Sequence, residues 1–279
     1  MTDLVVLDFS FNDLTGSIPT VLAKLSNLGE LWLEHNTLTG TLPSELGDIT
    51  YLSMLDIQFN QLVGTLPTEL TGSRALSSLY LSSNFFSGTI PTQFGQLRNL
   101  VDLYLDSNSL TGTLPTEIGT LMNLEWLDLY DNHLIGTLPT EFGQSISLRE
   151  IEVSTNFLTG TIPTELGLSN GLYGLYLYEN QFTGTLPTEF GLLTQMNILR
   201  IQENKFIGTL PTELGLLTLL EWLEVASNRL TGTLPTELSQ LTVLSWIDVS
   251  DNFFTGTIPE GLADVMDDNS LQPPNNFAP

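Results

Sequence analysis

Apolar and polar residues follow each other along the chain in a pattern that repeats every 24 positions. Asn marks this repeat, recurring eleven times from Asn12 to Asn252 without an insertion or deletion. Apolar residues stand eight, five and three positions before each Asn, and two, six and ten positions after it. Two apolar residues separated by one position, such as Leu103 and Leu105, predict a short strand with one buried face. Each repeat therefore predicts one turn of a coil, with strands of successive coils stacked in parallel.

Three polar or special residues mark the bends of each predicted coil. We expect the Asn to turn inward where the strand ends and to bond unpaired backbone groups, so that stacked Asn side chains form a ladder. Gly follows four positions later, at a tight turn, and Pro follows at seven, after a second short strand such as Thr137–Pro139. A helical turn should follow, with a Glu at its positive end. Eight glutamates have this structural interpretation: Glu45, Glu69, Glu117, Glu141, Glu165, Glu189, Glu213 and Glu237.

Each unit reads LxxLxLxxNxLxGxLPxxL, which matches the leucine-rich-repeat signature and extends it with Gly and Pro. From residue 4 to about 265 the chain resembles the plant-type leucine-rich-repeat class, found in the ectodomains of receptor-like kinases and receptor-like proteins and in polygalacturonase inhibitors. The resemblance implies an α/β repeat solenoid, an arc of about eleven 24-residue coils with a parallel sheet on its concave side and short helical turns on its convex side. We expect residues 1–265 to form the solenoid and residues 266–279 to be a disordered tail.

The net charge and the composition limit the classes of partner that the chain can bind. Seven Lys and Arg oppose 32 Asp and Glu, for a net charge of −25, which excludes nucleic acid and anionic membrane surfaces and favours a basic partner. The chain has no Cys, so disulfides and thiolate metal sites are excluded. Neither a signal peptide nor a transmembrane segment is expected. The family resemblance implies an extracellular or cell-surface location.

The coil leaves free the positions six, four, two and one before each Asn, which point out of the concave sheet. All four Trp and five of the seven Tyr lie there, together with many acids. Aromatic residues supply contact area and carboxylates select cations, so we predict that this face binds a basic protein or peptide. Strand propensity alone is the alternative reason for aromatic residues there. The predicted binding residues are Trp32, Tyr80, Asp102, Tyr104, Asp106, Trp126, Asp128, Tyr130, Asp131, Glu150, Glu152, Tyr176, Tyr178, Trp222, Glu224, Trp246 and Asp248, with the centre between Asp102 and Tyr178.

Two carboxylate pairs share a column on adjacent predicted strands, about 5 Å apart, which is the separation of the catalytic pair in a retaining glycosidase. The pairs are Asp128 with Glu152 and Glu224 with Asp248. An open sheet offers no enclosed pocket, so we expect no enzyme activity, no catalytic residue and no cofactor. No metal site is expected either: a weak Ca²⁺ site between such carboxylates is an alternative, but no dedicated loop supports it.

Two other functions stay open. Thr fills the position five after Asn in every repeat but the first, and Thr113, Thr137 and Thr161 belong to a regular hydroxyl and methyl array that could bind ice. Two observations count against this role. Sheet twist prevents a flat surface, and Val or Ile replaces Thr at the position three after Asn in some repeats. The chain could also be a structural fragment of a longer leucine-rich-repeat protein, because no cysteine-paired cap is present.

Overall fold

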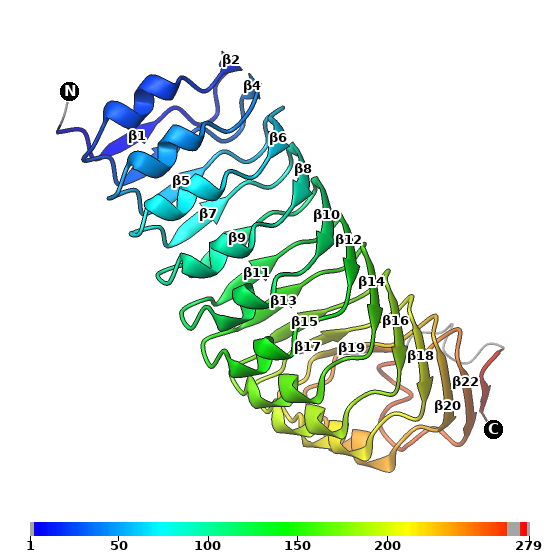
Figure 1. The fold of residues 1–279 in the computed structure, drawn as a ribbon. Helices are drawn as coiled ribbons and strands as arrows, with labels where there is room; N and C mark the ends of the chain where they lie inside the picture. The colour runs from blue at the N-terminus through cyan, green and yellow to red at the C-terminus, as the bar shows by residue number, and fades with distance from the viewer. Residues whose placement is uncertain (1–2, 267–273, 278–279) are drawn as a thin grey trace. The chain divides into compact units, whose positions relative to one another are not determined.

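A computed structural model describes residues 3–266 and 274–277. The chain divides into two compact units, Met1–Ile135 and Gly136–Pro279, and the boundary falls inside one strand. The same coil recurs in both units: a three-residue strand, a second short strand and a 3₁₀ helix (Figure 1). Each unit is thus a stack of 24-residue coils, as the sequence predicts.

The first strand of each coil belongs to a parallel sheet. In the first unit its strands are β1 (Val6–Asp8), β3 (Glu30–Trp32), β5 (Met54–Asp56), β7 (Ser78–Tyr80), β9 (Asp102–Tyr104) and β11 (Trp126–Asp128). In the second unit they are β13 (Glu150–Glu152), β15 (Gly174–Tyr176), β17 (Ile198–Arg200), β19 (Trp222–Glu224) and β21 (Trp246–Asp248). The central residue of each strand from β3 onward is Leu or Ile and is buried, whereas its neighbours point out of the sheet.

The second strand follows the Asn of each coil and pairs with its counterparts in parallel. The strands are β2 (Thr15–Ser17), β4 (Thr37–Thr39), β6 (Val63–Thr65), β8 (Phe85–Thr89), β10 (Ser109–Thr113), β12 (His133–Gly136), β14 (Phe157–Gly160), β16 (Gln181–Gly184), β18 (Lys205–Gly208), β20 (Arg229–Thr233) and β22 (Phe253–Gly256). The predicted position at Thr137–Pro139 was wrong. The strand β12 ends at Gly136, and Pro139 is already the residue that precedes the helical turn.

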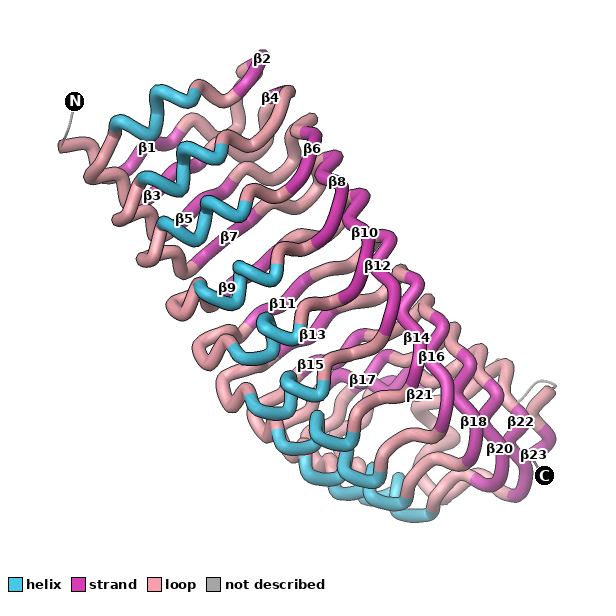
Figure 2. Tube along the Cα trace, viewed as in Figure 1, coloured by secondary structure: helices cyan, strands magenta, loops and turns pink. Residues whose placement is uncertain are grey.

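In the first ten coils a five-residue 3₁₀ helix starts after the repeat Pro, and these helices form a separate row (Figure 2). The helices are η1 (Thr20–Lys24), η2 (Ser44–Asp48), η3 (Thr68–Gly72), η4 (Thr92–Gln96), η5 (Thr116–Thr120), η6 (Thr140–Gln144), η7 (Thr164–Leu168), η8 (Thr188–Leu192), η9 (Thr212–Leu216) and η10 (Thr236–Gln240). The eight predicted glutamates lie in first turns. This confirms a short helical element with 3₁₀ geometry.

The Asn ladder is present and explains why an amide can be buried in every coil after the first. Asn36, which is 8% exposed, donates through Nδ2 to the carbonyl oxygens of Phe9, Leu33 and Glu34, and its Oδ1 accepts the amide of Leu14 at 2.9 Å. Two of these partners belong to the preceding coil. Each ladder Asn with this bonding therefore ties its coil to the one before it.

The ladder continues past the last predicted repeat. Asn275 is 5% exposed, accepts the amide of Phe254 at 3.0 Å and donates to the carbonyl of Val249 at 2.9 Å. The next two residues form β23 (Asn276–Phe277), which pairs with β22. These residues differ from the expected disordered tail. The rest of that expectation, over residues 267–273 and 278–279, lies outside the described residues.

Candidate functional site

The outward side chains of the first sheet, with the residues two and one positions before each ladder Asn, form a surface that we call the strand face. The residue just before each of the eleven Asn has a left-handed backbone, with φ between 50° and 55°. Phe, Ser, Asp, Thr and Glu all adopt it there, although this region is uncommon for non-glycine residues. The sequence did not predict this conformation. It tilts one side chain per coil, including Asp131, to the edge of the strand face.

In the first unit, several predicted acids are bonded to the neighbouring coil. Asp102 accepts the hydroxyls of Ser78 at 2.8 Å and Tyr80 at 2.9 Å, and the rings of Tyr80 and Tyr104 meet edge to face at 5.1 Å. Burial raises the pKa of Tyr80 to about 12, so its hydroxyl stays a donor. The hydroxyls of Ser78 and Tyr80 therefore compensate the charge of Asp102.

The predicted centre of the first unit combines aromatic and acidic side chains. Trp126 lies in register with Asp102, and Asp128 lies in register with Tyr104. Asp128 also accepts the backbone amide of Tyr130 at 3.0 Å. Trp126, Asp128 and Tyr130 are all half-buried, whereas Asp131 is exposed. Asp106 accepts the hydroxyl of Ser82, and burial raises the pKa of this carboxyl.

Trp32 lies between two carboxylates of the neighbouring strands. It is in register with Asp8 on one side and Asp56 on the other, and its indole N–H donates to Glu30 at 3.1 Å. Burial raises the pKa of Glu34 and Asp56. An indole flanked by carboxylates can bind a cation through its ring face and its charged neighbours.

An aromatic stack that the sequence did not predict runs beside this tryptophan. The ring of His35 lies 4.3 Å from that of Phe11 and 4.3 Å from that of Phe59, with interplanar angles of 20° and 10°. All three occupy the left-handed position before the ladder Asn. The 24-residue spacing of Phe11, His35 and Phe59 was the available signal, but it became meaningful only once the left-handed geometry was known.

In the second unit, two tryptophans form the largest aromatic feature. Trp222 and Trp246 stack on adjacent strands with centroids 5.4 Å apart, and Trp222 is 36% exposed. Beside them, Glu224 and Asp248 are in register. The side chain of Arg200 donates to Glu224 at 2.8 Å and lies 4.7 Å from the ring centroid of Tyr178. The predicted residues are thus adjacent here, although Glu224 is already paired.

The remaining predicted residues of the second unit lie on β13 and β15. Glu152 is in register with Tyr176, and Glu150 is in register with Gly174. A Cβ added to Gly174 would lie 2.8 Å from the Tyr176 ring, so this ring covers the glycine. Burial raises the pKa of Glu150 and of Tyr176. The expected proximity of Asp128 and Glu152 would join the two units and stays a prediction.

The carboxylates of Glu224 and Asp248, which the sequence placed in one column, are each bonded to another group. Glu224 and Asp248 do lie in register, but Arg200 pairs with the first, and Asp248 accepts the amide of Ser250 at 2.8 Å. Among the described residues, no group of three His, Cys, Asp or Glu side chains could hold a metal ion. Over the same part of the chain, no helix has the length and apolarity needed to span a bilayer.

The threonine rows of the second sheet have packing roles. The hydroxyl of Thr183 donates to the carbonyl of Gly160 in the preceding coil at 3.3 Å, as Thr111 does to Gly88 at 3.2 Å. The methyl of Thr161 covers the next glycine, since a Cβ added to Gly184 would lie 2.7 Å from it. Contacts between coils therefore supply a reason for these threonines that is independent of any ligand.

Comparison with known families and structures agrees with this architecture. The family model described as Leucine rich repeat matches residues 74–134, and a related model matches residues 3–25, 27–49, 219–241 and 243–265. The chain belongs to the leucine-rich-repeat family, and its repeats are of the plant type. No curated protein matches it in sequence.

Three solved structures illustrate the range of similar proteins. The ectodomain of the Arabidopsis receptor kinase HAESA, in complex with an N-terminally extended IDA peptide hormone, is 31% identical over 99% of this chain and 50% of that chain, with a TM-score of 0.80. The ectodomain of GASSHO1/SCHENGEN3 from Arabidopsis thaliana, in complex with CASPARIAN STRIP INTEGRITY FACTOR 2, is 29% identical over 99% and 38%, with a TM-score of 0.82. A plant ice-binding protein is 30% identical over 82% and 74%, with a TM-score of 0.74. The chain spans half or less of the two receptor ectodomains.

Proposed function

We propose that the chain is a non-catalytic recognition module that binds a basic protein or peptide on its strand face. The observation that carries this proposal is the stacked pair Trp222 and Trp246 beside the acids of the same strands. Neither indole belongs to the core, which the Leu and Ile of these strands fill. Large aromatic surfaces held on a rigid sheet are typical anchors for a protein partner.

The charge of the same region favours a cationic ligand. Along the edge of the strand face, Glu179, Glu203 and Asp251 are exposed at the left-handed position of their coils. Their carboxylates would attract a basic ligand and speed its approach, whereas the tryptophans would hold it. Structural similarity to receptor ectodomains that bind peptides supports this assignment and an extracellular or cell-surface location. In this view the chain is part of a receptor-like or inhibitor-like protein.

Synthetic peptides of one length that differ only in net charge test the proposal. Basic peptides should bind saturably and acidic ones should not. Trp222→Ala, and likewise Trp126→Ala in the other unit, should weaken binding by about 2 kcal/mol, mainly through faster dissociation. Phe253→Ala is the matched control, because Phe253 is 50% exposed but lies on the second sheet. Equal binding of acidic and basic peptides, or an equal loss in the control, would contradict the proposal.

The role of charge can be separated from that of contact area. Changing Asp128 to Asn together with Glu152 to Gln should slow association and flatten its dependence on salt, with little change in dissociation. Stopped-flow or biosensor kinetics at several salt concentrations measure both rates. An unchanged association rate would show that these two acids do not steer the ligand.

Ice binding is the second candidate, favoured by the regular threonine rows and by similarity to a plant ice-binding protein. The relevant surface would be the second sheet. Thr137→Tyr should then abolish inhibition of ice growth, whereas Trp222→Ala should leave it intact. Absence of ice-growth inhibition in the unmodified chain would remove this candidate.

A further inference from the structure

The row of 3₁₀ helices departs from its repeat at the junction of η3 and η4. Eleven residues after the ladder Asn, the chain has Gly47 in η2 and Gly95 in η4, but Thr71 in η3. A Cβ added to Gly47 would lie 1.9 Å from the carbonyl oxygen of Glu69, and one added to Gly95 would lie 2.5 Å from the Cβ of Glu117. At the usual spacing there is no room for a side chain. Thr71 therefore keeps η4 away from η3, and these two helices pack less closely than their neighbours do.

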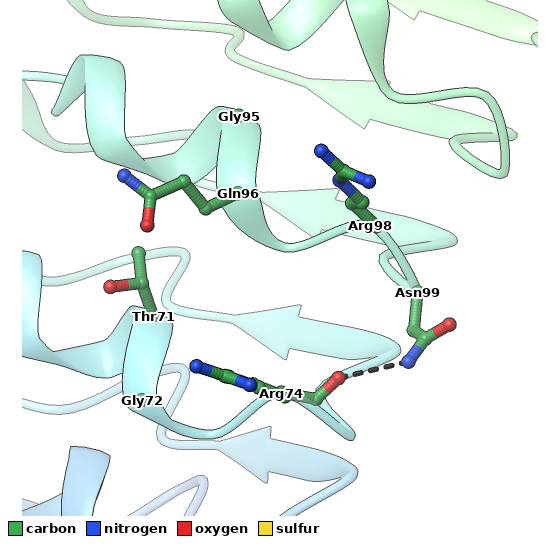
Figure 3. Close-up of a pocket in the computed structure, with 7 residues that line it drawn as sticks. All are labelled: Thr71, Gly72, Arg74, Gly95, Gln96, Arg98 and Asn99. Atoms are coloured by element: carbon green, nitrogen blue, oxygen red, sulfur yellow. Dashed lines mark hydrogen bonds between the residues drawn. The ribbon is translucent and has the colours of Figure 1, made fainter.

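A cavity of about 750 Å³ lies at this junction. Its lining includes Thr71 and Arg74 from the η3 side and Gln96, Arg98 and Asn99 from the η4 side. Figure 3 shows Thr71 and Gln96 facing each other across the junction, with the two arginines beside them. A neighbouring cavity of about 500 Å³ shares Arg98, so the hollow extends along the row toward η5.

The charge of this cavity is opposite to that of the molecule. Two of the seven Lys and Arg residues line it, and no carboxylate does, although the chain has 32 acids. The row of first-turn glutamates is interrupted at this junction, where Gln93 stands in η4. Within the described residues, neither guanidinium takes part in an ion pair, and both side chains are exposed. The loss of one acid and the presence of two arginines thus coincide with the wider spacing.

The backbone that carries the arginines is held in place. Asn99 donates through Nδ2 to the carbonyl of Arg74 at 2.9 Å, and Asn123 donates to the carbonyl of Arg98 at 2.8 Å (Figure 3 shows the first bond). These bonds join successive coils just where the guanidinium groups start. The amide of Gln96 adds a neutral hydrogen-bonding group to the same lining, whereas the hydroxyl of Thr71 donates to the carbonyl of Thr68 at 2.9 Å.

We propose that this cavity is a binding site for a small anionic ligand, whose carboxylate or phosphate group Arg74 and Arg98 bind. Guanidinium groups suit both oxyanions because their N–H donors form paired hydrogen bonds. The amide of Gln96 would bond a hydroxyl group of the ligand. The site lies outside the strand face, so it does not depend on the function proposed there.

Calorimetric titration with inorganic phosphate and, separately, with succinate tests this site at a fixed ionic strength. Either probe should bind saturably, and the tighter of the two identifies the ligand as phosphorylated or carboxylated. Arg74→Gln combined with Arg98→Gln should weaken that binding about tenfold or more. Arg229→Gln is the matched control, because Arg229 is an exposed arginine on β20, outside the cavity. It makes the net charge more negative without changing the cavity and should leave binding unchanged.

The role of the cavity itself is tested by Thr71→Gly, which restores the residue found at the matching position of η2. The two helices should then approach each other, and binding should weaken although both arginines remain. Urea denaturation checks that each variant is folded. The proposal is overturned if neither probe binds saturably, if Arg229→Gln weakens binding as much as the double variant, or if Thr71→Gly binds as tightly as the unmodified chain.

Discussion

Asn132→Ala tests whether the ladder stabilises the coil stack as its geometry indicates. Asn132 is 4% exposed and makes four hydrogen bonds. Its Nδ2 donates to the carbonyls of Leu105, Leu129 and Tyr130 at 3.1 to 3.3 Å, and its Oδ1 accepts the amide of Leu110 at 2.9 Å. Alanine removes all four bonds at once.

The expected cost comes mainly from the amide that loses its acceptor. Leu110 is fully buried, so water cannot replace Oδ1, whereas the carbonyl of Leu105 keeps the side chain of Asn108 at 3.1 Å. One buried unpaired donor costs about 1 to 3 kcal/mol. We therefore expect Asn132→Ala to lower the free energy of unfolding by about 2 kcal/mol, confined to its own coil and the neighbouring ones.

Urea denaturation followed by circular dichroism measures this loss, and hydrogen exchange of the Leu110 amide locates it. Asn12→Ala is the matched control. Asn12 is exposed and bonds only within its own coil, to the carbonyls of Phe9 at 3.2 Å and Ser10 at 2.8 Å. It should cost clearly less. An equal loss in both variants, or no loss in Asn132→Ala, would refute the idea that bonds between coils give the ladder its stabilising effect.

Three further predictions follow from single contacts. Gly112→Ala should destabilise the chain more than Gly16→Ala. Both glycines have positive φ, which costs an alanine about 1 to 2 kcal/mol, but only Gly112 has a threonine methyl 2.8 Å from the added Cβ. The midpoints of urea denaturation measure the difference between the two variants. Asn275→Ala should speed hydrogen exchange of the Phe254 amide, because the side chain of Asn275 accepts the hydrogen bond from this amide. Protection equal to that in the unmodified chain would show that Asn275 does not extend the Asn ladder. Burial raises the pKa of Asp56 above its ordinary 3.8, so the folded chain holds this proton more tightly than the unfolded chain does. The free energy of unfolding should therefore fall as pH rises from 3.8 through the raised pKa, and Asp56→Asn should flatten this dependence when urea denaturation is repeated across that pH range.

The repeat predicted most of the coil because each recurring residue has one dominant contact. The buried Leu column, the amide of Asn36 and the glutamates of the first turns all have the environments expected from their spacing. The second strand was misplaced because Pro recurs in every unit and marks the start of the helical turn, whereas the strand β12 ends three residues before Pro139, at Gly136. Asn275 was missed because it follows Asn252 by 23 residues, one fewer than the period.

The candidate site was less predictable because neighbouring side chains decide what an outward residue does. Periodicity placed Asp102 and Glu224 on the strand face, but it could not show that Tyr80 donates to the first and Arg200 pairs with the second. The left-handed residues were equally hidden, because the sequence at that position varies from Phe11 to Asp251. Contacts of this kind depend on two coils together, whereas the period describes one coil at a time.

A repeat chain provides its own internal control for separating structural from functional residues. A residue kept in every coil but the first, such as Thr161, whose methyl covers Gly184 in the next coil, needs no ligand to explain it. A residue that breaks the column at a cost in packing does need an explanation. Thr71 is such a residue, because it opens a gap between η3 and η4, whereas Gly47 at the matching position of η2 lets η2 and η3 pack closely. Arg74 and Arg98 line this gap in a chain that is otherwise acidic, and anion binding would explain why the gap is kept open. Residues that depart from the repeat therefore indicate function more directly than residues that follow it.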